Sequence, residues 1–280
     1  MAIITKVDHF YKKLKRKNKA ILAFNVVNLE TLKSFIEIAE EKQVDLVIQI
    51  SQNTIKNLGY DLIVPSLKKS LENSKANFVL HLDHCDDFNL LEKALKDGFK
   101  SVMFDGSFLD FKNNVFSSLK AKEMAKKYEA FLEVEIGQIL GKNSHENQDE
   151  NQKTKLEDIL EFYNLVKPDS LAFNFGTLHG IYKENPKIDF DLLKNVESKI
   201  CTVLVMHGTS GLSKKEIIKA WKFGITKINI GTDFNLAHIS AIKEFFEEYP
   251  NVKDIRKINL YAIKKIKEKT LYFLDMFAKK

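Results

Sequence analysis

The sequence has few cysteines and lacks long apolar runs. Its 280 residues include only two cysteines, Cys85 and Cys201, too few for a disulfide framework, so we expect a reducing, cytoplasmic environment. No apolar run approaches the roughly 18 residues that a membrane-spanning helix needs, and residues 1–19 contain no apolar stretch of signal-peptide length. We therefore expect neither a membrane protein nor a disulfide-stabilised secreted protein.

The excess of positive charge is confined to the end of the chain. The net charge is +6, and residues 253–280 contain nine Lys and Arg against three Asp and Glu, so the rest of the sequence is balanced. This pattern indicates either an anionic partner or a solvated helix face. No aromatic motif is interleaved with the basic residues, so we expect no nucleic-acid binding. A hydrophobic fraction of 44% excludes a disordered chain.

Short apolar runs alternate with amphipathic patterns along the chain. Each run is long enough for a strand but too short for an independent helix. Several are apolar nearly throughout, which is typical of a parallel sheet covered on both faces. The predicted strands are 21–25, 45–51, 77–83, 100–105, 130–135, 170–174, 201–207 and 226–230. The predicted helices include 29–42, 88–98, 116–128, 155–167 and 213–224.

The spacing of these strands predicts a (β/α)8 TIM barrel. Successive strand ends lie about 29 residues apart, close to one βα unit. A doubly wound open sheet is the alternative, but it would normally have a glycine-rich turn after its first strand, where this chain has NVVNLE. We expect one TIM-barrel domain over residues 1–280, with the barrel at about 20–245 and a helical tail at about 246–280. Residues 141–154, which are all polar or glycine, predict either a lid or a connection without a role.

Three histidines follow predicted strands, namely His84, His179 and His207. In a barrel the carboxyl ends of the strands meet at one rim, where the active site lies. Three imidazoles with an open fourth position are the ligand set of a catalytic zinc ion. The alternative for each histidine is a structural role.

Carboxylates lie at three strand ends, one of which also precedes His84. Asp105 and Glu135 predict a second cation position, a position that holds the metal before substrate arrives, or hydrogen bonds to the histidines. A monovalent cation is a further candidate cofactor. Asp83 directly precedes His84 and is a candidate for proton transfer near the metal.

Glycine-rich turns follow the last three predicted strands. They are GTLHGIYK (176–183), HGTSG (207–211) and NIGTD (229–233). Turns after the seventh and eighth strands commonly bind phosphate in such barrels, and ordinary tight turns are the alternative. The candidate phosphate ligands are the amides of Gly176, Gly180, Gly208, Gly211 and Gly231, the hydroxyls of Ser210 and Thr232, and the ammonium of Lys183.

These motifs, together with HLDHC (81–85), VMFDGS (102–107), EVEIG (133–137) and AFNVVNLE (23–30), resemble those of class II, zinc-dependent fructose/tagatose-bisphosphate aldolases. The resemblance covers residues 20 to about 235. It implies a glycolytic type of reaction, the reversible cleavage of fructose 1,6-bisphosphate to dihydroxyacetone phosphate and glyceraldehyde 3-phosphate through a zinc-stabilised enediolate. The alternatives are a tagatose-bisphosphate or other ketose-phosphate aldolase, or a barrel of low activity that binds metal or sugar phosphate.

The resemblance also implies a role for each site residue. Asp83 corresponds to the residue that exchanges a proton with the substrate hydroxyl. His84, His179 and His207 correspond to zinc ligands, and Asp105 and Glu135 to ligands of an alternative metal position. The substrate-binding positions are Asn25, Ser51, Gly180, Lys183, Gly208, Thr209, Ser210, Asn229, Ile230, Gly231, Thr232 and Arg256.

The chain departs from the family pattern at a few positions. Thr209 stands where the family usually has a glycine, and a positive φ there would strain the turn. Arg256 follows Ile255, where the family motif has proline.

The resemblance to the family further implies a homodimer or larger homo-oligomer.

Overall fold

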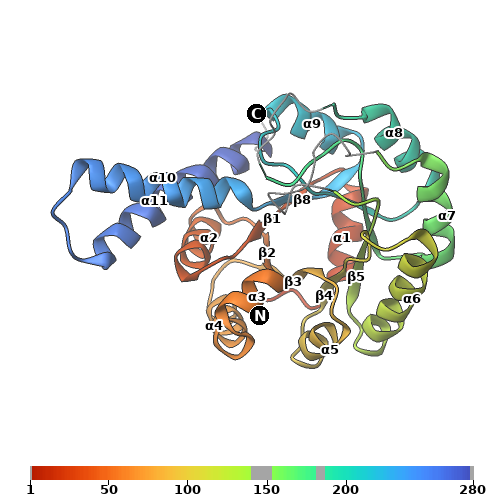
Figure 1. The fold of residues 1–280 in the computed structure, drawn as a ribbon, viewed down its shortest axis with the longest axis horizontal. Coiled ribbons are helices and arrows are strands. Elements are labelled where there is room, and N and C mark those ends of the chain that lie inside the picture. The colour runs from red at the N-terminus through yellow and green to blue at the C-terminus, as the bar shows by residue number, and fades with distance from the viewer. Residues whose placement is uncertain (1, 140–152, 181–186, 278–280) are drawn as a thin grey trace.

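Eight parallel strands form a closed barrel, which confirms the predicted (β/α)8 fold. The computed structural model describes residues 2–139, 153–180 and 187–277, and helices surround the barrel (Figure 1). The strands are β1 (Ile21–Asn25), β2 (Leu46–Ser51), β3 (Phe78–Cys85), β4 (Ser101–Phe104), β5 (Phe131–Ile136), β6 (Ser170–Phe173), β7 (Val203–Met206) and β8 (Ile225–Ile230). Each strand pairs with the next, and β8 pairs with β1.

Local sequence signals set several of the helix ends. Asn28 and Thr31 form a capping box before one helix, and Ser213 and Glu216 form a capping box before another. The helices are α1 (Val7–Arg16), α2 (Leu29–Lys42), α3 (Gln52–Leu58), α4 (Tyr60–Glu72), α5 (Phe88–Lys96), α6 (Phe111–Lys127), α7 (Leu156–Val166), α8 (Phe190–Lys199), α9 (Lys214–Lys222), α10 (Thr232–Glu248) and α11 (Ile255–Phe277). The apolar periodicity did not single out α1, α3, α4 or α8. Helix α3 has only seven residues, and α4 contains Pro65, which weakens a helical signal.

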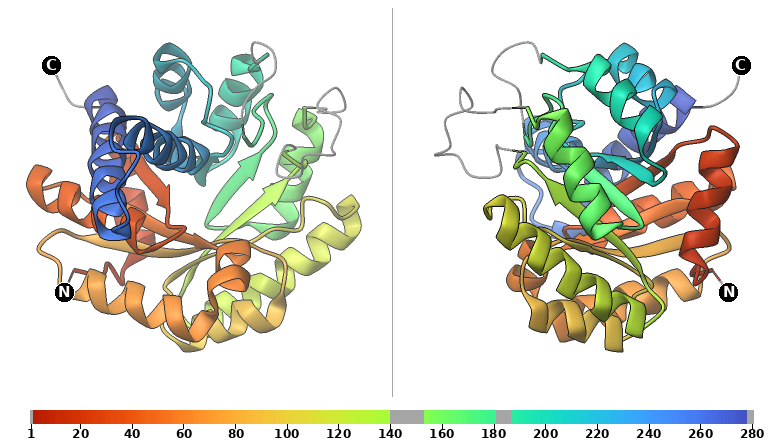
Figure 2. Two further views of the ribbon diagram at one scale, coloured as in Figure 1. Left: turned by 60° about the vertical axis from the view of Figure 1, so that its left-hand side comes forward. Right: turned by 90° about the vertical axis from the view of Figure 1, so that its right-hand side faces the viewer.

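Apolar side chains fill two separate regions. One large cluster lies between the barrel and the helices and includes Phe24, Leu82 and Leu204. A second cluster contains residues from the first half of several strands, and α1 covers it with Val7 and Tyr11. The Tyr11 ring stacks on Phe131 with the centroids 4.8 Å apart. Helix α1 therefore closes the amino end of the barrel (Figure 2).

The last two helices form an arm. Helices α10 and α11 run side by side and project beyond the ring of helices (Figure 1), which confirms the helical tail. Helix α10 continues through residue 246, where the tail was expected to begin, and ends only before Tyr249 and Pro250. The predicted start of the tail, at about residue 246, therefore lies within α10. None of the described helices has the length and apolarity that a membrane crossing requires.

Candidate metal and substrate site

A cavity of about 600 Å³ lies at the carboxyl ends of the strands. The structure brings fifteen of the eighteen predicted site residues to its lining. They are Asn25, Ser51, Asp83, His84, Asp105, Glu135, His179, Gly180, His207, Gly208, Thr209, Ser210, Asn229, Gly231 and Thr232. Residues up to two hundred positions apart meet here because a parallel barrel places every strand's carboxyl end at one rim.

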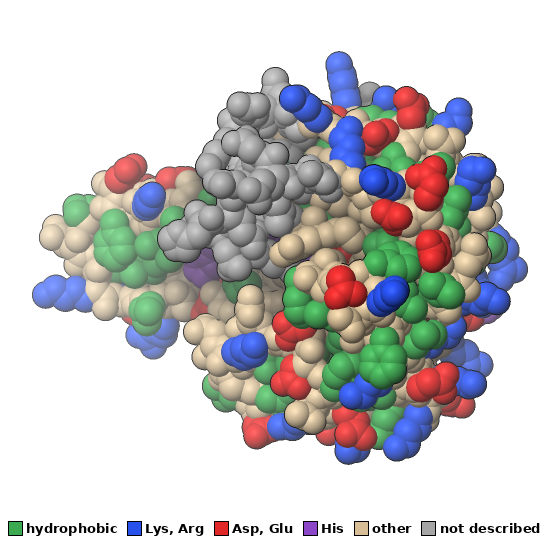
Figure 3. Space-filling view, turned by 45° about the vertical axis from the view of Figure 1, so that its right-hand side comes forward, with side chains coloured by type: hydrophobic (Ala, Val, Ile, Leu, Met, Phe, Trp, Pro, Cys, Tyr) green, Lys and Arg blue, Asp and Glu red, His purple; other side chains and the backbone are tan. Residues whose placement is uncertain are grey.

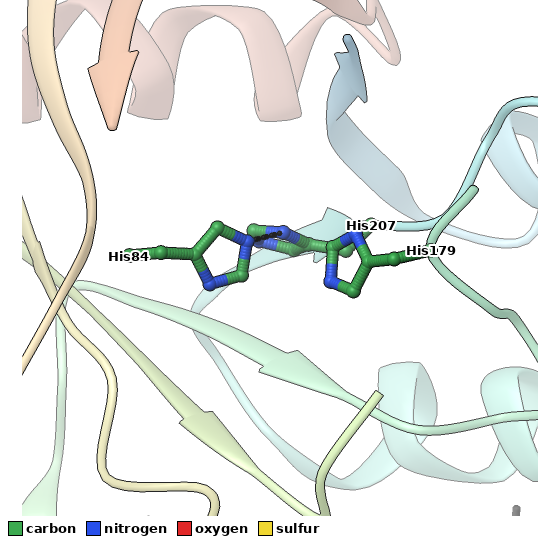
Figure 4. Close-up of side chains that lie close together, drawn as sticks. All are labelled: His84, His179 and His207. Atoms are coloured by element: carbon green, nitrogen blue, oxygen red, sulfur yellow. Dashed lines mark hydrogen bonds between the residues drawn. The ribbon is translucent and has the colours of Figure 1, made fainter. Parts of the chain in front are cut away.

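The three predicted metal-binding histidines point toward one another (Figure 4). The ring centroid of His84 lies 5.0 Å from that of His179 and 4.6 Å from that of His207, and the last two are 5.8 Å apart. One nitrogen of each ring lies within 4.8 Å of those of the other two. This arrangement fits a cation held by three imidazoles, as in catalytic zinc sites.

An irregularity at the end of β3 directs two neighbouring side chains into the cavity. The pairing with β4 shifts register between Leu82 and Cys85, and His84 has a φ of 46°. In a regular strand, Asp83 and His84 would point to opposite faces, whereas here both line the cavity. Such a positive φ costs a non-glycine residue about 1–2 kcal/mol, and strain of this kind concentrates at functional sites.

The position of Asp105 is compatible with both of its predicted roles, a hydrogen bond to a histidine and a ligand of a second cation position. Its Oδ2 is 2.6 Å from Nδ1 of His84, so it accepts the N–H of that ring and leaves Nε2 as the ligand atom. Asp105 also groups with His84 and Glu135, with ligand atoms within 4.8 Å of one another. The second set matches the predicted alternative metal position.

His207 is held from the opposite side by a carboxylate that the sequence analysis missed. Its Nε2 lies 2.9 Å from Oε1 of Glu133, and the other oxygen of Glu133 is 2.8 Å from Nζ of Lys227. All three side chains are 1% exposed. Burial alone would raise the pKa of Glu133, but the Lys227 charge and the His207 hydrogen bond hold it well below its usual range.

Asp83 has one oxygen bound and one available. Its Oδ2 accepts the side-chain amide of Asn25 at 2.8 Å, and Asn25 in turn accepts the amide of Gln49 at 2.8 Å. Its Oδ1 is buried and has no hydrogen-bond partner among the described residues. Burial acts to raise the pKa of Asp83, but electrostatic interactions with His84, His207 and Lys227 lower it to about 2. The carboxylate is therefore ionised and can accept a proton.

The turn after β7 is built around one required glycine. Gly208 has a φ of 68°, and a Cβ there would lie 2.5 Å from the carbonyl oxygen of Leu178. Thr209 lies outside the left-handed region, so the threonine at this position does not strain the turn. Its buried hydroxyl has no partner among the described residues, and Ser210 accepts the amide of Asp233 at 3.1 Å.

The turn after β8 leads into α10 and lies beside the turn after β7 in the cavity lining. Gly231 precedes this helix, and a Cβ there would be 3.0 Å from Oδ1 of Asn25. Asn229 places its amide 3.3 Å from His207, while its Oδ1 is buried without a described partner. Backbone amides at a helix start favour an anion, so the turns after β7 and β8 could together receive a phosphate.

Three of the eighteen residues to which the resemblance assigns a role are not part of this cavity lining, and neither are Gly176 and Gly211, two further candidate phosphate ligands. Ile230 is fully buried in the cluster between barrel and helices, so its side chain faces away from the cavity. Arg256 lies at the start of α11, outside the cavity of its own chain. Its side chain is 85% exposed and pairs with Asp254. Lys183 lies outside the described residues.

The residues that the sequence analysis missed follow a simple rule. Glu133, Lys227 and Gln49 each lie two positions before a predicted site residue on the same strand. Since side chains alternate along a strand, positions two apart face the same side. This period would have placed all three inside the barrel beneath the site.

The fold and the site together define a TIM-barrel protein with a histidine-rich site of metal-binding type. The family described as class-II fructose-bisphosphate aldolase matches residues 5–280. The chain is 33% identical over 249 residues to the sulfofructosephosphate aldolase of Alkalicoccus urumqiensis, covering 88% of this chain and 85% of that protein. The chain therefore belongs to the class II fructose-bisphosphate aldolase family.

Solved structures of similar proteins share this fold. The YdjI aldolase from Escherichia coli K12 has a TM-score of 0.85 at 26% identity, with 97% of this chain and 96% of that chain covered. A putative fructose-1,6-biphosphate aldolase from Coccidioides immitis shares the fold, with a TM-score of 0.87 at 22% identity over 98% of this chain and 96% of that chain.

Proposed function

We propose that the protein is a zinc-dependent aldolase that reversibly cleaves fructose 1,6-bisphosphate to dihydroxyacetone phosphate and glyceraldehyde 3-phosphate. The observation that carries this proposal is the convergence of three imidazoles and an ionised, buried carboxylate on one cavity. Cleaving a carbon–carbon bond beside a carbonyl requires stabilisation of negative charge on one fragment and removal of a hydroxyl proton from the other. The cavity offers groups for both.

His84, His179 and His207 would hold the zinc ion, with Asp105 and Glu135 as ligands of an alternative cation position. The donor set fits, because Asp105 and Glu133 accept the outer N–H groups of His84 and His207, which directs the remaining ring nitrogens to one point. A bound zinc ion supplies the Lewis acid beside the substrate carbonyl.

Asp83 is the proton acceptor in cleavage. Asn25 fixes Oδ2, which leaves the buried Oδ1 to take the C4 hydroxyl proton and to return it in the condensation direction. The amide of Asn25 holds the carboxylate in one orientation, and this positioning makes the proton transfer efficient.

The turns after β7 and β8 are proposed to bind the phosphate of the dihydroxyacetone half. Gly208, Thr209 and Ser210 lie on one side, and Gly231 and Thr232 on the other. Amides and hydroxyls without a fixed charge can still bind phosphate when several converge.

The distal end of the substrate is less defined by this chain. Among the described cavity residues none is a lysine or arginine, so a second phosphate would have to meet Lys183 or a group from another molecule. The similarity to a sulfofructosephosphate aldolase favours sulfofructose phosphate as a second candidate substrate, beside tagatose 1,6-bisphosphate.

The decisive experiment measures metal content and cleavage on purified protein. Fructose 1,6-bisphosphate, tagatose 1,6-bisphosphate and sulfofructose phosphate are compared side by side by their rates of dihydroxyacetone phosphate release. We expect a chelator to abolish cleavage and Zn²⁺ to restore it. Cleavage that survives chelation, with borohydride trapping a lysine adduct, would contradict the proposal.

We further propose that the chain forms a homodimer or larger homo-oligomer through its arm. Apolar side chains show on the face of the arm in Figure 3, and Ile255 and Leu260 are 67% and 62% exposed. Arg256 lies among them, so a role in binding the distal phosphate would require the cavity of another copy. Light scattering measures the particle mass of the unchanged chain and of Leu260→Glu. If the arm forms the interface, the variant should have the smaller mass.

A further inference from the structure

A buried ionic network lies directly beneath the candidate metal ligands. Glu133 on β5 and Lys227 on β8 form an ion pair of 2.8 Å, and each side chain is 1% exposed. The second oxygen of Glu133 is 2.9 Å from Nε2 of His207. His81 lies 3.8 Å from Glu133 and has Ser101 at 2.7 Å on its other nitrogen.

The network does not line the cavity, since neither Glu133 nor Lys227 is among its lining residues. It does not contact a substrate there, and Glu133 joins it to the cavity lining through its hydrogen bond to His207. An ion pair is also an unfavourable way to fill a barrel interior, because desolvation of both charges offsets most of their attraction. The position of this pair therefore calls for a reason other than stability.

Glu133 determines which nitrogen of His207 faces the cavity. An ionised carboxylate only accepts hydrogen bonds, so Nε2 of His207 must carry the proton that it donates to Glu133. The lone pair of the neutral ring is then on Nδ1, which lies 2.9 Å from Nε2 of His84. The contact also fixes the plane of the ring.

Lys227 determines how the carboxylate is oriented. It occupies the second oxygen of Glu133, so the first oxygen is left for His207. The two contacts come from neighbouring positions around the barrel wall. His207 directly follows β7 and Lys227 lies on β8, and together they hold the carboxylate between them.

We infer that the Glu133–Lys227 pair is a positioning device that presents Nδ1 of His207 to the metal ion. The inference rests on the proposed role of His207 as a metal ligand. Glu133 and Lys227 are positioning residues, because they act on the metal through the imidazole. Loss of a carboxylate behind a ligating histidine typically lowers metal affinity about 10- to 100-fold.

The test separates metal affinity from stability. The double variant E133L/K227M removes both charges and keeps a similar apolar volume, and such replacements of a buried pair are often neutral for folding. We expect its thermal unfolding without metal to stay near that of the unchanged chain. Its Zn²⁺ affinity, measured by competition with a chromophoric chelator, should fall about 10- to 100-fold. The visible spectrum of the Co²⁺-loaded variant should change, because the ligand field at His207 changes.

A second pair of variants tests the same inference by rescue. In E133Q the carbonyl of the new amide turns toward the Lys227 ammonium, so its NH₂ group faces Nε2 of His207 and favours the wrong tautomer. Adding K227M frees the amide to turn around and accept the His207 N–H. We expect E133Q/K227M to bind Zn²⁺ more tightly than E133Q, an order that a purely structural role does not predict.

The control is Ser101→Ala, which alters the same buried layer through His81 and does not touch His207. We expect its Zn²⁺ affinity and Co²⁺ spectrum to be unchanged. Unchanged affinity in E133L/K227M, or no recovery in E133Q/K227M, would overturn the inference. If the unchanged chain fails to bind Zn²⁺, or His179→Ala binds it equally well, the proposed function itself is wrong.

Discussion

Replacing Asp83 with asparagine removes the proposed proton acceptor while keeping its shape. Asp83 is 3% exposed, and within the described part of the chain only its Oδ2 is bound, to Asn25 at 2.8 Å. The asparagine carbonyl can keep this hydrogen bond, so the change is confined to the group that faces the cavity. An amide cannot take the hydroxyl proton. Because positioned general bases contribute about 10²- to 10⁴-fold, we expect kcat to fall by that factor, or roughly 3 to 5 kcal/mol in the barrier.

The assay follows cleavage of fructose 1,6-bisphosphate by coupling released dihydroxyacetone phosphate to NADH oxidation. Zinc content is measured on the same samples, and we expect it to be unchanged because Asp83 is not in the predicted ligand set. The matched control is Asp86→Asn. Asp86 also lines the cavity, but it accepts a hydrogen bond from Gln52 at 2.6 Å and is exposed, so its loss should leave kcat nearly unchanged.

Two results would refute this reasoning. If Asp83→Asn keeps kcat within about tenfold of the unchanged enzyme, Asp83 is not the general base. If the variant loses its zinc, Asp83 supports the metal site, and its effect on kcat says nothing about proton transfer.

Three further changes probe other parts of the molecule. Gly208→Ala should distort the turn after β7, because a positive φ costs about 1–2 kcal/mol and the new Cβ would lie 2.5 Å from the Leu178 carbonyl oxygen. We expect the KM of the phosphorylated substrate to rise about tenfold. An unchanged KM would show that this turn does not bind phosphate. Tyr11→Ala should lower the free energy of unfolding in urea by about 3–5 kcal/mol, since the ring is 1% exposed beneath the barrel, and zinc affinity should not change. Burial raises the pKa of Asp169, so the folded state keeps this proton to higher pH than the unfolded state, and stability falls as pH rises from the ordinary aspartate pKa to the raised folded value. Asp169→Asn should remove this loss, because asparagine does not titrate and its side-chain carbonyl can still accept the Leu132 amide. Urea unfolding at several pH values measures the free energy of unfolding against pH, and the same pH dependence in the variant would show that the assignment is wrong.

The network under the site shows why the sequence analysis stopped where it did. Residues at strand ends stand out because a polar side chain interrupts an apolar run, as with Asp83 after VLHL. Glu133 and Lys227 lie within strands and carry no such signal alone. Their pairing joins β5 to β8 across the barrel interior, a contact that depends on closure and register.

The position of Arg256 illustrates a different limit. The local motif resembles a phosphate-binding segment, yet the residue lies on the arm, away from the cavity of its own chain. A motif specifies the chemistry of a side chain, but the length and direction of the helices before it specify its location. Helix α10 carries the chain outward for 17 residues, and no pattern of single residues encodes that displacement.

The order and spacing of short apolar runs were sufficient to predict the barrel, because hydrophobic periodicity is a local property and parallel strands require covering helices. The same order predicted which histidines and glycines reach one rim, since closure of a barrel brings all strand ends together. Only the tertiary structure decided how those residues are held: the bulge that turns His84 inward, the Asn25 contact that leaves one oxygen of Asp83 available, and the ion pair behind His207. These depend on angles and distances between strands far apart in sequence, which local patterns do not specify.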